Sequence, residues 1–532
     1  MNKALVSYAS TGFFSKAVTD YIEGSEKLKP FYTYAPQLSS FPEIIKNRQQ
    51  HPFYREELSN ALIRQYEPFE QKDCVDAVKA NIIRLKDTGT FTIVTAHQPN
   101  LFLGPLYLIY KIISTINLAR QLSETMTGYH FVPVYWMGSE DHDKEELNHI
   151  HLFGKTISWN TDQQGAFGRM KTDSLALLID EIKAVLGTSE EAVRCIGLLE
   201  MSYLKESSIA AATKRLLYHF FGADGLVIVD GDDHALKKLF IPVMKSELYE
   251  QFSFPIVNKS TGLFSESYTS QITPREINLF YLDDGIRNRI IKEGDTWNVL
   301  NTTHSFTADE LQKLLLEQPE KFSPNVVLRP LYQELVLPNI AFIGGGAEIT
   351  YWMQLKALFL SAGVAFPMLL LRNSAVWIDQ ANVTRMKKLN FSADIIFKPV
   401  DKLTDIFLQQ QAGQSISLDE ERKLLIEMME RTLERAIALD GSLKGAVEAE
   451  KVKMLKSMDA LEEKLKKAVK RKEEGALQQL HVLKEKLFPA NSLQERYDNF
   501  IAYYLKYGPG FIDSLKKNFD PMDQRFTLLM EE

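Results

Sequence analysis

The chain of 532 residues is longer than a usual single domain, with 45% hydrophobic residues, 25% charged residues and a net charge of -7. The acidic balance argues against a general nucleic-acid binder, and two cysteines, Cys74 and Cys195, exclude a disulfide framework or a cysteine-rich zinc site. The length predicts two domains, or one domain with a large insertion. The N terminus has no apolar signal core and no run reaches the roughly 20 apolar residues of a membrane span, so we expect a cytoplasmic protein with neither nucleic acid nor membrane as a partner.

Residues 91–118 predict a strand, a polar loop and a helix, in that order. The strand, 91–95, is short and rich in β-branched and aromatic residues, whereas 96–105 contains too much Pro, Gly and Asn to continue it. The helix after this loop begins with backbone N–H groups that lack internal partners and favour a carboxylate or a phosphate. Such a group could be surrounded by His97, Gln98, Asn100 and Lys111.

A second apolar run, 129–137, ends in the acidic quartet Glu140, Asp141, His142 and Asp143. In a parallel α/β sheet, this loop and the loop after 91–95 would lie at the carboxyl ends of neighbouring strands, where ligands of such folds bind. The sequence therefore predicts that the loop bearing Gln98 and the acidic quartet face one cleft.

Strands and helices continue to alternate, which predicts an α/β core with a parallel sheet. One further strand ends in the carboxylates of residues 230–233, and another runs into the glycines at 344–346, which match neither a P-loop nor a dinucleotide fingerprint. The predicted elements are a hairpin at 147–159, helices over 172–221, a strand from 225, a helix at 235–252, a hairpin at 277–291 around Asp-Asp-Gly, and strands at 340–344 and 366–373.

From residue 418 the chain is rich in Glu, Lys, Leu and Ala and predicts a helical hairpin. Its second arm carries an apolar seam at alternating steps of four and three residues, formed by Met454, Met458, Leu461, Leu465 and Ala468. The stripe is long enough that we expect a partner chain, which predicts a homodimer through or near the coiled coil. The predicted domains are an α/β core at 1–415, the hairpin at 416–488, and C-terminal helices at 489–532 that return to the core.

Four groups of residues, in this order along the chain, resemble the BshC family, the cysteine-adding enzymes of bacillithiol biosynthesis. They are His97-Gln98-Pro99-Asn100 with Gly104-Pro105-Leu106-Tyr107 and Lys111; Pro133-Val134-Tyr135-Trp136 with Ser139 to Asp143; Ser323 to Pro330 with Tyr332-Gln333, Leu337-Pro338, Gly344, Glu348 and Tyr351-Trp352; and Leu493-Gln494-Glu495-Arg496. The family commonly has Gly-Gln-Gln where this chain has Ala96-His97-Gln98, so no role for His97 is carried over.

The resemblance implies a Rossmann-like core that carries an α-helical coiled coil. It also implies a ligase that joins the carboxyl of cysteine to the amine of glucosaminyl malate through an amide bond. No standard ATP-binding motif is present, so the activating cofactor is unknown, and an adenine nucleotide, ATP or ADP, is the candidate. A second pocket, at the junction of core and coil, would bind this nucleotide through Arg496.

An amide-forming site needs a base for the ammonium proton, donors for the developing oxyanion and partners for anionic substrate ends. The acidic quartet supplies the candidate bases, and we expect Asp141 or His142 to take the proton. Arg329 and Lys111 are the expected carboxylate partners. The remaining substrate-binding candidates are His97, Gln98, Asn100, Tyr107, Gln333, Glu348 and Trp352.

Each of these assignments has an alternative. The acidic quartet could be a solvated turn, Arg329 a structural ion-pair residue, and Glu348 only a helix cap. His142 with Asp141 or Asp143 could bind Mg²⁺ or Zn²⁺, but no second histidine at ligand spacing supports that, and we predict no metal. At the level of the whole protein, the alternatives are an amide ligase with a different amine acceptor and a non-catalytic metabolite-binding scaffold that acts through its coiled coil.

Overall fold

The core of the protein is a sheet of five parallel strands in the order β13-β12-β2-β3-β6. The computed structural model describes residues 1–51, 53–69, 76–412 and 417–532. The strands are β2 (Thr90–His97), β3 (His130–Met137), β6 (Val227–Asp230), β12 (Asn339–Gly344) and β13 (Met368–Leu371). The predicted α/β core with a parallel sheet is confirmed, and β2 and β3 are neighbours in register, with Phe91 beside Phe131 and His97 beside Met137.

Helices cover both faces of this sheet, and so its strands are apolar on both sides. On one face, Ile93 and Ile343 pack with Ile44 of α3 (Phe41–Arg48) and Leu118 of α6 (Tyr107–Thr125). On the other face, Phe342 stacks on Trp352 of α15 (Gly346–Ser361), with 4.1 Å between ring centroids. Further helices around the core are α4 (Arg55–Tyr66), α5 (Asp76–Arg84), α11 (His234–Glu250), α12 (Ser253–Ser265) and α14 (Arg329–Val336).

Two excursions surround the carboxyl ends of the strands. The first begins with α7 (Lys144–Leu147), which was not predicted, and continues with the predicted hairpin, β4 (His149–Leu152) with β5 (Lys155–Ser158). The predicted helices follow as α8 (Ala176–Leu186), α9 (Glu190–Tyr203) and α10 (Ile209–Phe221). The second is an antiparallel sheet in the order β10-β9-β8-β7-β11. Its elements are β7 (Leu279–Asp283), β8 (Ile286–Glu293), β9 (Thr296–Val299), β10 (Ser305–Phe306), α13 (Ala308–Glu317) and β11 (Phe322–Pro324).

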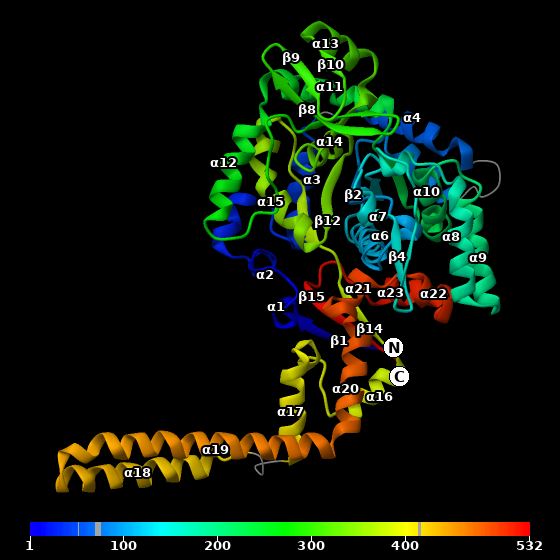
Figure 1. Cartoon of the computed structure of the whole chain (residues 1–532). Helices are drawn as coiled ribbons and strands as arrows, with labels where there is room; N and C mark the ends of the chain where they lie inside the picture. Colours follow the sequence, from blue (N-terminus) through cyan, green and yellow to red (C-terminus); the bar gives the residue numbers. More distant parts are fainter. Residues whose placement is uncertain (52, 70–75, 413–416) are drawn as a thin grey trace.

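A third sheet lies between the core and the long helices and unites the two ends of the chain (Figure 1). In it, β15 (Arg525–Met530) pairs antiparallel with β1 (Asn2–Ser7) and parallel with β14 (Ala375–Ile378). The prediction that 489–532 consists of helices is therefore wrong at its end. The helices there and at the N terminus are α1 (Tyr8–Thr11), α2 (Lys16–Ile22), α21 (Gln494–Tyr497), α22 (Ile501–Tyr507) and α23 (Pro509–Asn518).

The predicted helical hairpin is present as α18 (Asp419–Leu439) and α19 (Lys444–Lys472), which run side by side as an arm that points away from the core (Figure 1). α16 (Gln380–Lys388), α17 (Val400–Ala412) and α20 (Glu474–Leu487) join the arm to the core. Ion pairs from Arg422 of α18 to Asp459 and Glu462 of α19 link the two antiparallel helices.

No helix among residues 1–51, 53–69, 76–412 and 417–532 is long and apolar enough to cross a membrane. Cys195 is buried in α9, where burial raises the pKa of its thiol to about 11. Cys74 lies outside the described residues.

Candidate active site

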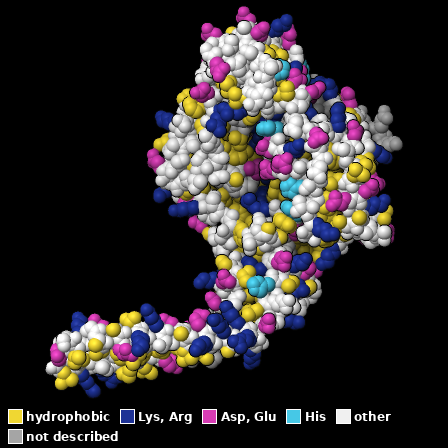
Figure 2. All heavy atoms as spheres, viewed as in Figure 1, with side chains coloured by type: hydrophobic (Ala, Val, Ile, Leu, Met, Phe, Trp, Pro, Cys, Tyr) yellow, Lys and Arg dark blue, Asp and Glu magenta, His cyan; other side chains and the backbone are white. Residues whose placement is uncertain are grey.

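A cavity of about 530 Å³ opens at the carboxyl ends of β2, β3 and β12. Figure 2 shows it as a hollow in the face of the core, with acidic and histidine side chains at its edge. Its walls come from the loops after these strands, from α7, β4 and β8, and from the N termini of α14 and α15. Residues of α21, almost 400 positions further along the chain, complete it.

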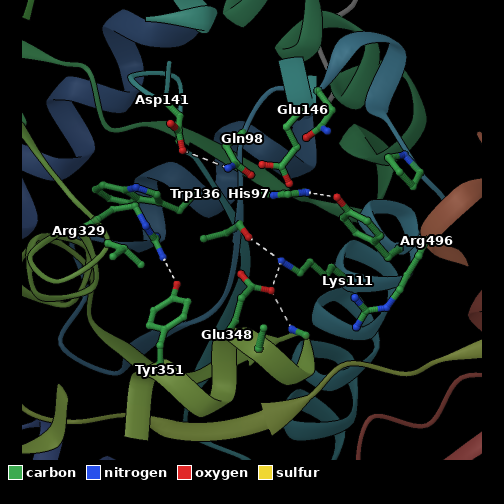
Figure 3. A pocket seen from close by; sticks show the side chains of 18 of the residues that line it. His97, Gln98, Lys111, Trp136, Asp141, Glu146, Arg329, Glu348, Tyr351 and Arg496 are labelled. Carbon is green, nitrogen blue, oxygen red and sulfur yellow. Dashed lines mark hydrogen bonds and ion pairs between the residues drawn. The ribbon is translucent and has the colours of Figure 1, made fainter. Parts of the chain in front are cut away.

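The loop bearing Gln98 and the acidic quartet meet at this cavity, as the prediction of one shared cleft requires. Gln98 Nε2 donates to Asp141 Oδ2 at 3.1 Å (Figure 3), and the Gly138 N–H donates to the His97 carbonyl at 2.8 Å. The Tyr135 hydroxyl donates to the His97 and Gln98 carbonyls at 3.0 and 3.2 Å. Neighbouring parallel strands thus place the two loops in direct contact.

The loop after β2 has a strained backbone. Phe102, Leu103 and Gly104 have φ angles of 48°, 64° and 57°. Residues other than glycine rarely adopt this left-handed backbone conformation. Gly104 is required here, since a Cβ atom at this position would lie 2.7 Å from Asn100 Cβ. Asn499 holds the loop by donating to the Phe102 and Gly104 carbonyls at 3.1 and 2.7 Å. The Asn100 side chain is thereby fixed at the cavity wall.

Asn100 presents a polar atom that has no partner in the described part of the chain. Its side chain is buried and lines the cavity, and its Oδ1 atom accepts no hydrogen bond from described residues. A buried carbonyl oxygen without a donor is costly. A donor group on a bound ligand would relieve that cost.

Glu140 and Asp141 both line the cavity, but neither is a free base. Buried Lys237 of α11 forms an ion pair with Glu140, and burial raises the pKa of this carboxyl while the lysine opposes the shift. Burial also works to raise the pKa of Asp141, yet hydrogen bonds from His142 and Gln98 and the charge of Arg287 hold it well below its usual range. Asp141 is therefore an anion that binds protons poorly, contrary to the prediction that it takes the ammonium proton.

His142 and Asp143 do not line the cavity. His142 Nδ1 lies 2.7 Å from Arg287 Nη1, its ring packs at 5.4 Å from that of Phe280, and Asp143 is an exposed residue that precedes α7. The prediction that His142 is a base is therefore not supported by its position. Ligand atoms of Asp141, His142 and Asp143 lie within 4.8 Å of one another, but His142 and Asp143 are exposed, and acidic turns of this kind are common without a metal.

The carboxylates at the end of β6 and in the loop after it lie outside the cavity and contact the loop after β3 and the elements around it. Ser139 donates to Asp230, Arg169 makes two hydrogen bonds to Asp232 at 2.6 and 2.7 Å, and Asp233 caps α11. Burial and the neighbouring Asp232 raise the pKa of Asp230 to about 6. These three groups are not part of the cavity wall.

Lys111 and Glu348 form a buried ion pair at the base of the cavity (Figure 3). Lys111 Nζ also donates to the Ala96 carbonyl at 2.9 Å, and Glu348 accepts from the Gly345 N–H at 2.8 Å. Although burial opposes ionisation, Lys111 keeps the pKa of Glu348 below its usual range. Glu348 therefore caps α15 and neutralises Lys111. Lys111 is thus not available to bind a substrate carboxylate, contrary to the prediction.

Arg329 lines the cavity and has no carboxylate partner among the described residues. Its guanidinium donates to the Tyr351 hydroxyl at 2.7 Å and to Gln333 Oε1 at 3.3 Å. Gln333 and Trp352, two predicted substrate-binding residues, are wholly buried and do not line the cavity. Gln333 positions Arg329, and Trp352 packs in the core against Phe342.

Arg496 lies in this same cavity and not in a second pocket at the coiled coil, which corrects the prediction (Figure 3). Burial and then Arg372 lower the pKa of Arg496, and no described carboxylate pairs with it. The neighbouring Arg372 is neutralised by Glu495 at 2.7 Å. Arg329 and Arg496 thus lie on opposite sides of the cavity, and neither has a carboxylate partner among the residues that the structure describes.

Sequence reasoning missed Lys237, Arg287, Glu146 and Arg372. Arg287 is in the predicted hairpin and Lys237 in a predicted helix, but nothing in their spacing indicates that either approaches the acidic quartet. Glu146 had a signal, because it follows Asp143 by three residues and so lies one helical turn away.

His97 is a neutral imidazole at the cavity wall. Its Nε2 atom lies 2.8 Å from the Tyr107 hydroxyl, and burial, then the charge of Lys111, lower its pKa to about 3. It therefore offers a phosphate no positive charge. Burial raises the pKa of Tyr107 above its usual range, so this pair stays uncharged.

The low pKa of His97 predicts a loss of stability in acid. The unfolded imidazole binds a proton below about pH 6.5, whereas the folded one does so only near pH 3. Stability therefore falls as the pH falls through this window, by at most about 1.4 kcal/mol per pH unit from this residue. Urea unfolding at pH 6.5 and 4.5 should show a smaller decrease for His97→Gln than for the wild type. His481→Gln, which changes an exposed histidine of α20, is the control. Equal decreases in the wild type, His97→Gln and His481→Gln would contradict this assignment.

The fold and the cavity together define a Rossmann-like α/β protein with a polar ligand site at the carboxyl ends of its strands. Residues 1–373 match the family model described as the N-terminal Rossmann-like domain of bacillithiol biosynthesis BshC, and residues 375–531 match its C-terminal coiled-coil domain. The chain belongs to the BshC family.

Full-length relatives support this membership. Proteins named "Putative cysteine ligase BshC" are 42% identical in Flavobacterium psychrophilum, covering 98% of each chain, and 41% identical in Flavobacterium johnsoniae, covering 98% of this chain and 99% of that one. A third protein of that name, from Christiangramia forsetii, is 39% identical and covers 98% of each chain.

Proposed function

We propose that the protein is a cysteine ligase of bacillithiol biosynthesis, which joins the carboxyl of cysteine to the amine of glucosaminyl malate as an amide. The observation that carries this proposal is the charge pattern of the cavity. Within the described part of the chain, Arg329 and Arg496 have no carboxylate partner and lie on opposite walls, while anionic Asp141 lies between the two loops. Such a site suits substrates that carry both carboxylates and an ammonium group.

The malate part of glucosaminyl malate carries two carboxylates, which match the planar donor groups of an arginine. Arg329 is the better placed for them, because Tyr351 and Gln333 fix its orientation. Gln98 and Asn100 would supply neutral hydrogen bonds, with Asn100 Oδ1 accepting from a substrate hydroxyl or ammonium group. The Lys111–Glu348 ion pair would form the base of the cavity beneath the ligand.

Amide formation requires a cysteine carboxyl that carries a leaving group. We propose an adenine nucleotide, ATP, as its source: transfer of a phosphoryl or an adenylyl group from ATP to a carboxylate oxygen of cysteine would release ADP or pyrophosphate. Attack by the amine nitrogen would then form the C–N bond as the C–O bond to the phosphorus-bearing group breaks, and the electron pair of that bond would leave with phosphate or AMP. Gly346 and Ala347 line the cavity at the N terminus of α15, where backbone N–H groups lack helical partners and could stabilise the developing oxyanion.

Product formation tests this function. Purified protein is incubated with cysteine, glucosaminyl malate and ATP, and the thiol product is measured by mass spectrometry, with omission of each component as a control. We expect a product that is heavier than glucosaminyl malate by a cysteinyl group and that depends on protein. If the protein is a scaffold, we expect no product with ATP or with a chemically activated cysteine. Product formed with another amine, and not with glucosaminyl malate, would indicate a different acceptor.

We also propose that the protein is a homodimer through the arm. Apolar side chains of α18 and α19 stay exposed even though the two helices pack together; they include Leu424, Met428, Ile437, Val452 and Leu461. A second copy of the arm could bury exposed apolar side chains of this set.

Light scattering should give twice the 60.8 kDa of one chain. The double substitution Leu424→Glu and Leu461→Glu should reduce the mass to that of one chain, because charges would then lie in an apolar interface. The matched control, Glu420→Gln with Glu463→Gln on the same two helices, should remain dimeric. A wild-type mass of one chain would exclude the dimer.

A further inference from the structure

Four carboxylates line the cavity within the described residues: Glu140, Asp141, Glu146 and Glu348. Three of them have strong partners. Glu140 is held by Lys237, Asp141 by Gln98, the His142 N–H and the nearby Arg287, and Glu348 by Lys111 and the Gly345 N–H. These three carboxylates maintain the shape and charge of the cavity, so a proton acceptor must be sought elsewhere.

Glu146 is the fourth, and its carboxylate makes no ion pair or hydrogen bond with any described residue. It is in α7, directly after the acidic quartet, and its side chain is exposed at the cavity wall beside His97 (Figure 3). The titratable groups around Glu146 are Tyr107 of α6 and His149 of β4, on neighbouring elements, and Asp141 and Asp143, in the turn before α7. No lysine or arginine among the described residues forms an ion pair with Glu146, so its carboxylate is available to a substrate ammonium group.

We propose that Glu146 is the general base that takes the proton from the ammonium group of the amine substrate. This inference rests on the proposed ligase function. The step is a proton transfer from R–NH₃⁺ to the Glu146 carboxylate, which gives R–NH₂ and a neutral carboxyl group. The nitrogen lone pair that is released can then attack the activated carboxyl carbon, and no other reactant takes part in the transfer.

The environment of Glu146 suits this role. Partial burial, followed by the negative charges of Asp143 and Asp141, raises the pKa of its carboxyl. A carboxylate whose pKa is closer to that of an amine is the stronger base. The same negative charges attract the ammonium group before the proton moves. Asp141 has the opposite property, since its low pKa makes it a weak base and a stable counter-ion.

Glu146→Gln keeps the shape of the side chain and removes the base, and Glu145→Gln is the matched control, because Glu145 is an exposed residue of the same helix that does not line the cavity. For Glu146→Gln we expect kcat to fall by about 100-fold or more, with the KM for glucosaminyl malate changed little. Glu145→Gln should retain wild-type kcat. The thermal unfolding midpoint of each variant shows that it is folded.

The pH profile distinguishes a base from a residue that only shapes the site. Wild-type kcat should rise with pH as Glu146 ionises and then reach a plateau. In Glu146→Gln the plateau should be lost, and the rate should keep rising as free amine forms in solution. Added acetate should restore part of the rate to Glu146→Ala but not to Glu146→Gln, whose side chain fills the space.

The possible outcomes separate this inference from the proposed function. If the wild type makes no product, the ligase function fails, whatever Glu146 does. If the wild type is active and Glu146→Gln matches Glu145→Gln in kcat and in pH profile, the function stands and the assignment of Glu146 is overturned. A Glu146→Gln variant with a low kcat that keeps the wild-type plateau also overturns the assignment of Glu146, because a different residue then causes the pH dependence.

Discussion

Replacing Arg329 with methionine is expected to lower kcat/KM for glucosaminyl malate by about 10- to 150-fold, since hydrogen bonds to a charged group contribute about 1.5 to 3 kcal/mol. Arg329 lines the cavity, has no carboxylate partner among described residues, and is held by Tyr351 and Gln333. Its guanidinium is therefore oriented before the substrate arrives, which limits the entropy lost on binding. Initial rates of product formation at several substrate concentrations measure the effect.

Two further variants show whether the arginine itself is needed. Arg329→Lys keeps the charge but not the planar pair of donors, so we expect it to recover only part of the loss. Arg275→Met removes an exposed arginine that does not line the cavity and should match the wild type. An Arg329→Met variant with wild-type kcat/KM would show that the anionic end of the substrate binds elsewhere.

Replacing Lys237 with methionine is expected to lower the free energy of unfolding by about 3 to 5 kcal/mol, because it leaves a buried carboxylate without its counter-ion. Lys237 is 0% exposed and Glu140 8% exposed, and the ammonium group also donates to the Phe322 carbonyl at 2.5 Å. This lysine joins the acidic loop after β3 to β11 of the antiparallel sheet. Urea unfolding followed by circular dichroism measures the loss.

The double variant Lys237→Met with Glu140→Gln tests the reason for that loss. Removing both charges should be less destabilising than the sum of the two single substitutions, because neither partner is left ionised and unpaired. Additive losses would show that the two side chains act independently. A Lys237→Met variant as stable as the wild type would mean that water reaches Glu140 in solution.

The parallel core could be predicted from the sequence because each of its strands is a short apolar run between turn residues. The spacing of β2, α6 and β3 also placed two polar loops at one edge of the sheet, and Gln98 and Asp141 meet there. The third sheet could not be predicted in this way. β1 and β15 pair Asn2 with Met530, and no local pattern indicates such a distant partner.

Local patterns predicted the site residues of the two loops, and the family resemblance added Tyr107, Arg329 and Glu348, which also line the cavity. Arg496 and Arg287 reach the cavity from α21 and β8, whose approach depends on the packing of the whole chain. Gln333 and Trp352 were predicted from motif membership, but motif residues also fill cores, and both are wholly buried. Asp141 was predicted as a base because neighbouring carboxylates raise pKa values, and the hydrogen bonds that reverse this effect come from the folded loop.

The central claim is that the cavity between the loop bearing Gln98 and the acidic quartet is where the amine substrate binds. A crystal structure of the protein with glucosaminyl malate tests it most directly. We predict ligand density in this cavity, with malate carboxylates at hydrogen-bond distance from Arg329 and the amine nitrogen beside Glu146. Well-defined ligand density elsewhere, with this cavity occupied only by water, would contradict the account.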